Sequence, residues 1–208
     1  MNGLFVFEGV EGSGKTTLIE AVQHALTTKK IPTSRTREPG GSNLGTKIRE
    51  LLLESSEQNT KIAPLSELLL FCADRSQHLT EVIKPLIQQK TLVLCDRFIY
   101  STIAYQVYGR GIDPKLVNSL NEIVLSGFKP NGVILLDIDP SLSFKRVSAR
   151  GAKDRFEKED ESFHQKIRKG YLEIAKANKD LFLVLDANKT TEELSELTLK
   201  FISERAYV

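Results

Sequence analysis

Cysteine is scarce in this 208-residue chain, which contains only Cys72 and Cys95. The two lie far apart and outside any spacing typical of metal ligands, which argues against a disulfide scaffold and against a zinc site. The chain also lacks an apolar run of about 18 residues, which excludes a transmembrane helix. Its first residues do not place a basic region before a long apolar stretch, so we predict no secretory signal and a cytoplasmic protein.

Charge of one sign is not in excess either. Lysine and arginine total 29 against 27 aspartates and glutamates, a formal net charge of +2. This balance gives no general electrostatic reason to expect binding to a nucleic acid or a membrane surface. With 40% hydrophobic and 27% charged residues, the composition predicts one globular domain over residues 1–208 and argues against disorder.

Four short apolar runs are predicted to be buried strands: residues 4–8, 91–96, 132–137 and 181–186. None alternates polar with apolar residues, which is typical of parallel strands covered on both faces. A weaker fifth strand is predicted over residues 31–36, and helical patterns separate the strands. Strands that alternate with helices predict an α/β fold, a parallel five-stranded sheet flanked by helices through right-handed crossovers.

Apolar residues at helical spacing mark one apolar face on each predicted helix. In the second helix these are Leu44, Ile48, Leu51 and Leu52. In a longer helical pattern over residues 64–89 they include Leu65, Leu68 and Leu69. The long pattern suits an internal core helix and, equally, a contact between two copies of the chain.

A glycine-rich segment follows the first predicted strand. Residues 9–16 match G-x-x-x-x-G-K-[ST] and lie between a strand and a helix, as the pattern requires. The glycines allow a tight loop whose backbone N–H groups converge on phosphate oxygens, and the next helix adds its positive end. Lys15 can reach the β- and γ-phosphates, and the Thr16 hydroxyl can bind Mg²⁺. The segment predicts binding of a nucleoside triphosphate; a glycine-rich turn with a chance Lys-Thr is the alternative.

The sequence lacks the marks of two other classes of phosphate-loop protein. A GTPase would need D-x-x-G and N-K-x-D, yet no Asp is followed by Gly three positions later and neither Asn-Lys pair has the final Asp. A motor or helicase core would be longer and would carry a surface for nucleic acid, which the charge balance does not support.

Asp96 and Arg97 follow the Leu-Val-Leu-Cys strand, at the edge of a parallel sheet where ligands bind. Asp96 can hold Mg²⁺ through water, and Arg97 can clamp a second phosphate-bearing substrate. Alternatively, Asp96 caps a helix and Arg97 forms a surface ion pair. A later basic segment contains Arg150 and Arg155. Cations on a closing loop can stabilise phosphoryl transfer, although a solvated stretch of charge is the simpler interpretation.

Together these residues resemble the bacterial-type thymidylate kinases, which are P-loop nucleoside monophosphate kinases. The resemblance covers nearly the whole chain. It is carried by residues 7–17, 36–41, 71 with 75, 96–98, 101–106, 108–111, 136–140, 150–151 and 154–155. It implies the P-loop NTPase fold with a small lid at about residues 146–160. The implied reaction is ATP-dependent phosphorylation of dTMP to dTDP, a step towards dTTP.

The resemblance also implies a role for individual residues. ATP phosphates would be bound by Gly9, Val10, Glu11, Gly12, Ser13, Gly14, Lys15, Thr16 and Thr17, with Thr16 and Asp96 serving Mg²⁺. The dTMP site would comprise Glu11, Arg37, Glu38, Pro39, Arg49, Phe71, Arg75, Arg97, Ser101, Thr102 and Tyr105. The catalytic cations would be Lys15, Arg97, Arg150 and Arg155.

Some of these implied roles are specific to an atom group of the nucleotides. Phe71 would stack on thymine while Arg75, one helical turn later, donates to a base carbonyl. Tyr105 would leave little room for a 2′-hydroxyl, and Glu11 would meet the 3′-hydroxyl. Residues 186–188 would surround adenine. Because the phosphate loop has no arginine, the lid would supply that charge, and the resemblance also implies a homodimer.

The residues alone leave two other functions open. A deoxynucleoside kinase would also combine a phosphate loop with a pyrimidine pocket, and a regulatory module would bind ATP without turning it over. At single positions the plain alternatives are core packing for Phe71 and a solvated helix position for Arg49. The number of basic groups available for an acceptor phosphate favours the monophosphate kinase.

Overall fold

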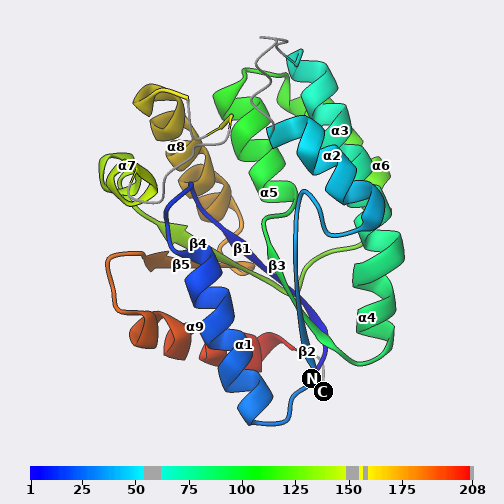
Figure 1. Cartoon of the computed structure of the whole chain (residues 1–208), viewed down its shortest axis with the longest axis vertical. Helices are drawn as coiled ribbons and strands as arrows, with labels where there is room; N and C mark the ends of the chain where they lie inside the picture. The colour runs from blue at the N-terminus through cyan, green and yellow to red at the C-terminus, as the bar shows by residue number, and fades with distance from the viewer. Residues whose placement is uncertain (54–61, 149–154, 157–158, 207–208) are drawn as a thin grey trace.

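The computed structural model describes residues 1–53, 62–148, 155–156 and 159–206 of the chain (Figure 1). Helices and strands alternate along it, and two segments, η1 and η2, are π-helical turns. The elements are β1 (Gly3–Glu8), α1 (Lys15–Thr28), β2 (Thr33–Arg37), α2 (Asn43–Leu53), α3 (Pro64–His78), η1 (Leu79–Ile83), α4 (Lys84–Gln88), β3 (Leu92–Asp96), α5 (Ile99–Thr102), η2 (Ile103–Gly109), α6 (Pro114–Leu125), β4 (Gly132–Asp137), α7 (Pro140–Ser148), α8 (Glu161–Ala177), β5 (Phe182–Asp186) and α9 (Thr191–Arg205).

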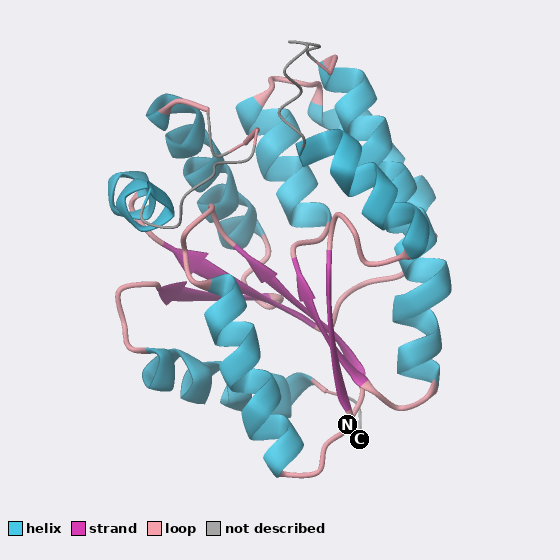
Figure 2. Ribbon diagram, in the orientation of Figure 1, coloured by secondary structure: helices cyan, strands magenta, loops and turns pink. Residues whose placement is uncertain are grey.

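The five strands form one parallel sheet in the order β2-β3-β1-β4-β5 (Figure 2). The predicted α/β fold with a parallel five-stranded sheet is therefore confirmed. The central strands β1, β3 and β4 are buried along nearly their whole length, which explains their unbroken apolar sequences. The edge strand β2 begins two residues later than predicted, because its sequence TSRTR is polar and largely half-buried or exposed.

Helices cover both faces of the sheet. α1 and α9 lie together on one face, whereas α4 and α8 contact the other (Figure 1). α1 turns Leu18, Ile19 and Val22 to the core, and α8 turns Ile167 and Tyr171 to it. None of the described helices combines the length and the apolar character needed to cross a membrane.

The long helical pattern predicted over residues 64–89 is confirmed, because α3, η1 and α4 follow one another without a break. Pro85 stands at the second position of α4. A proline has no backbone N–H and its ring displaces the carbonyl one turn earlier. The wider π-helical turn immediately before it accommodates both effects and keeps the segment helical.

The predicted apolar faces of two helices are only partly buried. In α3, Leu68 is fully buried, but Leu65 and Leu69 are 49% and 48% exposed. The same holds in α2, where Ile48 and Leu52 are buried while Leu44 and Leu51 face outward. Each predicted apolar face thus contains both buried and exposed leucines, and for α3 the exposed ones leave open the alternative of a contact between two copies of the chain.

The direction of the strands positions the site. Because all five run parallel, the residues that follow β1, β2 and β3 meet at the same edge of the sheet. The phosphate loop (residues 9–17) leaves β1 there, and a loop with a cis peptide bond between Glu38 and Pro39 leaves β2. Arg97 leaves β3 at the same edge.

Candidate active site

The phosphate loop depends on glycine for its backbone conformation and, at Gly9, also for space. Gly9 and Gly14 have φ angles of 142° and 96°, in the region that favours glycine. A Cβ added to Gly9 would lie 2.5 Å from the backbone oxygen of Leu136. The loop therefore keeps a tight path into the N-terminus of α1, whose free N–H groups suit a phosphate.

Lys15 lies across this loop. Its ammonium donates to the carbonyl oxygens of Gly9 and Val10 at 2.9 and 3.0 Å. Burial, together with the positive charge of Arg97, lowers the pKa of Lys15 to about 8. A phosphate placed beside this ammonium would replace weak carbonyl partners with a full negative charge.

Thr16 and Asp96 approach each other from α1 and β3. The Thr16 hydroxyl donates to one Asp96 oxygen at 3.5 Å, and the other Asp96 oxygen is buried with no protein partner. Among the described residues no cluster of three or more His, Cys, Asp or Glu side chains forms a protein cage for a metal. Mg²⁺ does not need one, because it commonly binds through one carboxylate, phosphates and water. The donor set at this point fits Mg²⁺.

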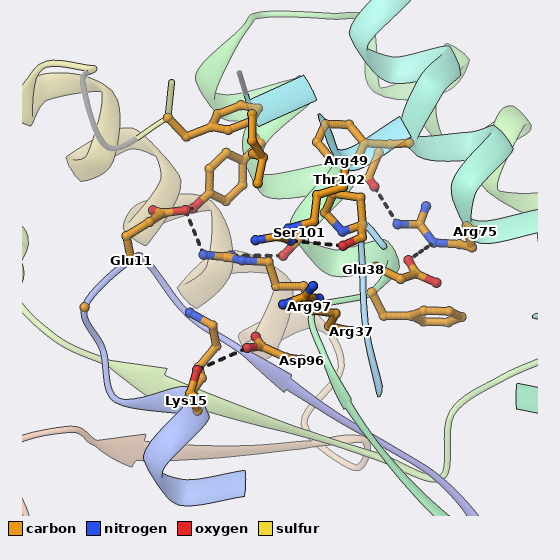
Figure 3. Close-up of a pocket in the computed structure, with 18 of the residues that line it drawn as sticks. Glu11, Lys15, Arg37, Glu38, Arg49, Arg75, Asp96, Arg97, Ser101 and Thr102 are labelled. Carbon is orange, nitrogen blue, oxygen red and sulfur yellow. Dashed lines mark hydrogen bonds and ion pairs between the residues drawn. The ribbon is translucent and has the colours of Figure 1, made fainter. Parts of the chain in front are cut away.

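Arg97 occupies the centre of the site (Figure 3). It has a φ of 68°, a left-handed conformation that is rare for a side-chain-bearing residue and is often found at functional sites. Its guanidinium donates to Glu11 at 2.8 Å and to the hydroxyls of Ser101 and Tyr171 at 3.2 Å each. It also lies 5.2 Å from the ring centre of Tyr105. These contacts hold a cation in the middle of the pocket.

Glu11 completes this centre from the phosphate loop. Tyr105 donates its hydroxyl to Glu11 at 2.6 Å, and His164 lies 3.6 Å from the same carboxylate. Burial raises the pKa of Glu11, but the positive charges of Arg97 and Lys15 outweigh it and lower that pKa overall. Glu11 is thus a carboxylate that can accept a hydrogen bond from a substrate hydroxyl.

Glu8 lies beneath the pocket, fully buried at the end of β1. It accepts hydrogen bonds from the backbone N–H groups of Phe98 and Ser101 at 2.9 and 3.1 Å. The hydroxyls of Ser101 and Tyr171 donate to it at 2.6 and 2.9 Å. Burial raises the pKa of Glu8. Glu8 therefore satisfies the free N–H groups at the start of α5, which carries Ser101 and Thr102 into the pocket.

The far end of the pocket is organised by Arg75, which is 1% exposed. Its guanidinium donates to Glu38 at 2.8 Å, to Thr102 at 2.9 Å and to Asn121 at 3.2 Å. It also lies 5.2 Å from the ring centre of Phe98. Five N–H groups are available on arginine and three are used here, so Arg75 can still donate to a ligand.

Two further buried residues of α3 support Glu38. His78 contacts Glu38 at 3.0 Å through Nδ1 and Thr36 at 2.6 Å through Nε2. Asp74 accepts the backbone N–H of Gly40 at 2.9 Å. Burial and the negative charge of Glu38 raise the pKa of Asp74 to about 6. The loop after β2 is thus held to α3 at two points, by His78 at Glu38 and by Asp74 at Gly40.

Aromatic rings and two more arginines line the rest of the pocket. Phe71 is half-buried on α3, and its ring centre lies 6.1 Å from that of Phe156. Arg49 of α2 donates to the carbonyl of Pro39 at 2.9 Å. Arg37 is exposed at the end of β2 and faces the pocket. Phe71 thus contributes to the pocket wall as well as to packing.

One cavity of about 250 Å³ joins these groups (Figure 3). Among the predicted site residues, those that line it are Glu11, Gly12, Gly14, Lys15, Thr16, Thr17, Arg37, Glu38, Pro39, Arg49, Phe71, Arg75, Asp96, Arg97, Ser101, Thr102 and Tyr105. Those that do not are Gly9, Val10 and Ser13, which lie within the phosphate loop, and Arg155. The roles predicted for all of them remain predictions.

The predicted lid arginines have different outcomes. Arg150 lies outside the described residues. Arg155 is described, and its guanidinium donates to the backbone oxygen of Leu52 at 2.9 Å and to the Glu67 carboxylate at 2.5 Å. In this structure Arg155 therefore points to α2 and α3. The start of the predicted lid is also helical, since α7 extends to Ser148.

Several contributors to the site escaped the sequence reasoning. Glu8, Tyr171 and His164 support its centre, and Asp74 and His78 support its far end. Glu8 could have been noticed in the sequence, because it is a charged residue at the end of an apolar strand, directly before the phosphate loop. Asp74 and His78 flank Arg75 on one helix, but nothing in their spacing indicated burial.

Comparison with known proteins agrees with this geometry. The thymidylate kinase family model matches residues 7–197. A thymidylate kinase of Trichodesmium erythraeum is 45% identical, with 96% of this chain and 94% of the relative covered. One of Deinococcus radiodurans is 40% identical over 99% of this chain and 98% of the relative. The crystal structure of the Ehrlichia chaffeensis thymidylate kinase superposes with a TM-score of 0.77 at 32% identity, over 97% of this chain and 98% of that one. The chain therefore belongs to the thymidylate kinase family.

Proposed function

We propose that this protein catalyses the ATP-dependent phosphorylation of dTMP to dTDP. The observation that carries the proposal is that one continuous pocket has two distinct ends. The phosphate loop with Lys15 forms one end, the buried donor Arg75 forms the other, and Arg97 lies between them. Such a pocket suits two nucleotides whose phosphates meet in the middle, and the family relationship supports thymidylate as the acceptor.

At the acceptor end, the pyrimidine would lie against Phe71. Arg75 would donate one of its remaining N–H groups to a base carbonyl, which distinguishes thymine from a base that presents an amino group there. The Tyr105 ring would lie beside the sugar, and the Glu11 carboxylate would accept from the 3′-hydroxyl. Arg97 would bind the acceptor phosphate through its forked guanidinium.

The reaction forms one P–O bond and breaks another. An oxygen of the dTMP phosphate attacks the γ-phosphorus of ATP, and the bond to the β–γ bridging oxygen breaks to leave ADP. Because the attacking oxygen is already ionised, no strong base is required. Lys15 and Arg97 hold the two nucleotides in line and offset the negative charge that gathers between them.

Magnesium fits the donors at the edge of the sheet. Thr16 and Asp96 would hold the ion, and it would supply charge neutralisation to the ATP phosphates. The unpartnered buried oxygen of Asp96 supports this assignment. The remaining charge assigned to Arg150 stays a prediction, as does the cytoplasmic location.

Release of ADP with different acceptors tests the proposed reaction. We expect rapid release with ATP and dTMP and none above background with ATP and thymidine. Phosphorylation of thymidine but not of dTMP would instead identify a deoxynucleoside kinase. Tight ATP binding with no acceptor-dependent ADP would identify a regulatory module. Lys15→Met serves as the control for a contaminating kinase, since its rate should fall to background.

We further propose that the protein is a homodimer that uses the outer face of α3 and α6. These helices pack on each other. Leu65 and Leu69 on α3 and Leu116 and Ile123 on α6 are between 41% and 74% exposed. Their spacings of four and seven residues place each pair on one side of its helix. Single exposed apolar residues are normal on a protein surface, but a group of them marks a contact site. A second copy of the chain would cover this group.

A further inference from the structure

Glu67 is a buried carboxylate that the proposed chemistry does not use. It lies on α3 with 1% of its side chain exposed. One oxygen accepts from Gln106 at 2.7 Å and from Arg110 at 3.3 Å. The other accepts from Arg155 at 2.5 Å. Side chains from two separate parts of the chain, residues 106–110 and Arg155, thus converge on one buried charge of α3.

The charges of this cluster balance. Arg110 also pairs with Glu159 at 2.6 Å, so two arginines face two carboxylates. The second pair is more exposed than the first, with 31% of the Glu159 side chain accessible against 1% for Glu67. Glu67 therefore makes the enclosed and strongly held contact, while Glu159 makes a peripheral one.

The cluster continues into the acceptor end of the pocket through Phe156. The Arg155 guanidinium lies 4.6 Å from the ring centre of Phe156, and that of Arg110 lies 5.8 Å from it. The Phe156 ring is 5% exposed and lines the pocket. Its centre is 5.6 Å from Tyr105 and 6.1 Å from Phe71. Three aromatic rings thus surround the space assigned to the pyrimidine nucleoside.

Glu67 and Phe71 are also connected along the helix. They are four residues apart on α3 and lie on neighbouring turns of one side. Phe71 is fixed by the helix itself, whereas Phe156 belongs to a turn that contacts α3 through Arg155. The ion pair between Arg155 and Glu67 therefore connects the turn that carries Phe156 to the helix that carries Phe71.

We propose that Glu67 is a positioning residue for the acceptor nucleotide: through Arg155, and with Arg110, it holds Phe156 against Phe71 and Tyr105. The inference rests on the proposed function, because it assigns the space between these rings to dTMP. It gives Arg155 an anchoring role at the acceptor end. Direct neutralisation of the transferring phosphate by Arg155 would require this buried pair to break first.

The absence of tryptophan from the sequence provides a direct test. Phe156→Trp introduces one tryptophan, at the pocket wall, whose emission is separated from that of the five tyrosines by selective excitation. We expect its emission to change on addition of dTMP. Adding Glu67→Gln to this variant should shift the emission of the free protein to the red and increase quenching by acrylamide, since the ring is no longer held. A merely structural role for Glu67 elsewhere in the fold would not move this signal.

Binding and turnover give the second readout. In an otherwise unchanged chain, Glu67→Gln should raise the KM for dTMP about tenfold, the loss expected for one charge-assisted contact. The KM for ATP and the kcat at saturating dTMP should change by less than about twofold, since neither depends on Phe156. Glu122→Gln, an exposed substitution on α6, is the matched control and should leave all three values unchanged.

Arg155→Gln keeps the test valid if the Glu67 variant folds poorly, because its side chain is 22% exposed. It should reproduce the rise in KM for dTMP. The double variant should raise this KM no further than either single change does, since both single changes break the same contact. A lower kcat at saturating substrates with an unchanged KM for dTMP would overturn the proposal and restore a direct role for Arg155. Lack of any dTMP response by wild type and the tryptophan variant alike would instead refute the proposed function.

Discussion

The guanidinium of Arg75 lies 2.8 Å from the carboxylate of Glu38, and the two side chains are only 1% and 2% exposed. Removing one partner leaves the other charge buried without compensation, which typically costs about 3–5 kcal/mol. We therefore expect Glu38→Ala to lower the free energy of unfolding by about 3 kcal/mol or more. Urea denaturation followed by circular dichroism measures this loss.

A surface pair provides the comparison. Glu20 lies 2.7 Å from Arg35, but both side chains are more than half exposed. Glu20→Ala should change the free energy of unfolding by less than about 1 kcal/mol. Equal losses in the two variants would contradict the view that Glu38 is held by a desolvated charge.

Asp74 gives a prediction about pH. Burial raises its pKa to about 6 in the folded protein, whereas an unfolded Asp titrates near 3.9. Between these values the folded state binds more protons than the unfolded state, so this carboxyl makes the protein less stable as pH rises from about 4 to about 6. Asp74→Asn removes the titration. Its stability relative to wild type should increase across that window, by about 3 kcal/mol at most.

Denaturation curves at several pH values between about 4 and 7 measure this difference. Parallel stability profiles of wild type and variant would show that Asp74 is not held in its neutral form by burial. Above about pH 7, Asp74 is ionised in both the folded and the unfolded state. The difference in stability between variant and wild type should therefore stop increasing there, and the two profiles should run parallel.

Lys15 should make ATP binding weaken in alkaline solution. Its pKa of about 8 in the free protein means that the ammonium is charged below this pH and increasingly neutral above it. Because phosphate favours the charged form, the Kd for ATP should be nearly constant up to about pH 8. It should then rise by at most about tenfold per pH unit. Calorimetric titrations from about pH 7.5 to 9.5 test this, and the Lys15→Met variant should bind weakly with no such rise.

Asp96 should set the magnesium requirement. Asp96→Asn removes the negative charge but keeps the shape, so we expect the Mg²⁺ concentration for half-maximal rate to rise about tenfold or more. Thr16→Val should act in the same direction with a smaller effect, because it removes a neutral donor. An unchanged Mg²⁺ dependence in both variants would refute the assignment of these two side chains to the metal.

The outer face of α3 and α6 predicts a change in oligomeric state. Ile123 is 74% exposed, so Ile123→Glu should cost the isolated chain little. A carboxylate placed in an apolar contact between copies would instead separate them. Sedimentation equilibrium should show a dimer for wild type and a monomer for the variant. A monomeric wild type would end the proposal of a homodimer.

The sequence was sufficient for the architecture because buried parallel strands leave a strong record. Residues such as Leu4, Val6, Leu94 and Ile134 form unbroken apolar runs. The glycine-lysine pattern marks the phosphate loop between β1 and α1. The edge strand β2 left a weaker record, since its Ser34 and Arg35 do not need an apolar environment. Its predicted boundaries were accordingly displaced.

Residues that line the pocket were easier to anticipate than the buried residues that support them. Lys15 and Arg97 belong to local patterns with a chemical meaning, so their position in the pocket could be predicted. Glu67 and His78 act through partners about 40 residues away in the chain, Gln106 and Glu38. No short pattern records such a contact. Burial of a charged side chain depends on the tertiary fold, which local spacing does not encode.

The contacts of Glu8 have a consequence for catalysis. Its backbone leads directly into the phosphate loop, proposed to bind the phosphoryl donor, and its carboxylate holds the first residues of α5, proposed to bind the acceptor. The Glu8 side chain therefore connects the proposed donor site to the proposed acceptor site, and we expect its length to influence the distance between them. Shortening this residue by a single methylene, as in Glu8→Asp, would change the separation of the two proposed sites. No residue assigned to a nucleotide would be substituted.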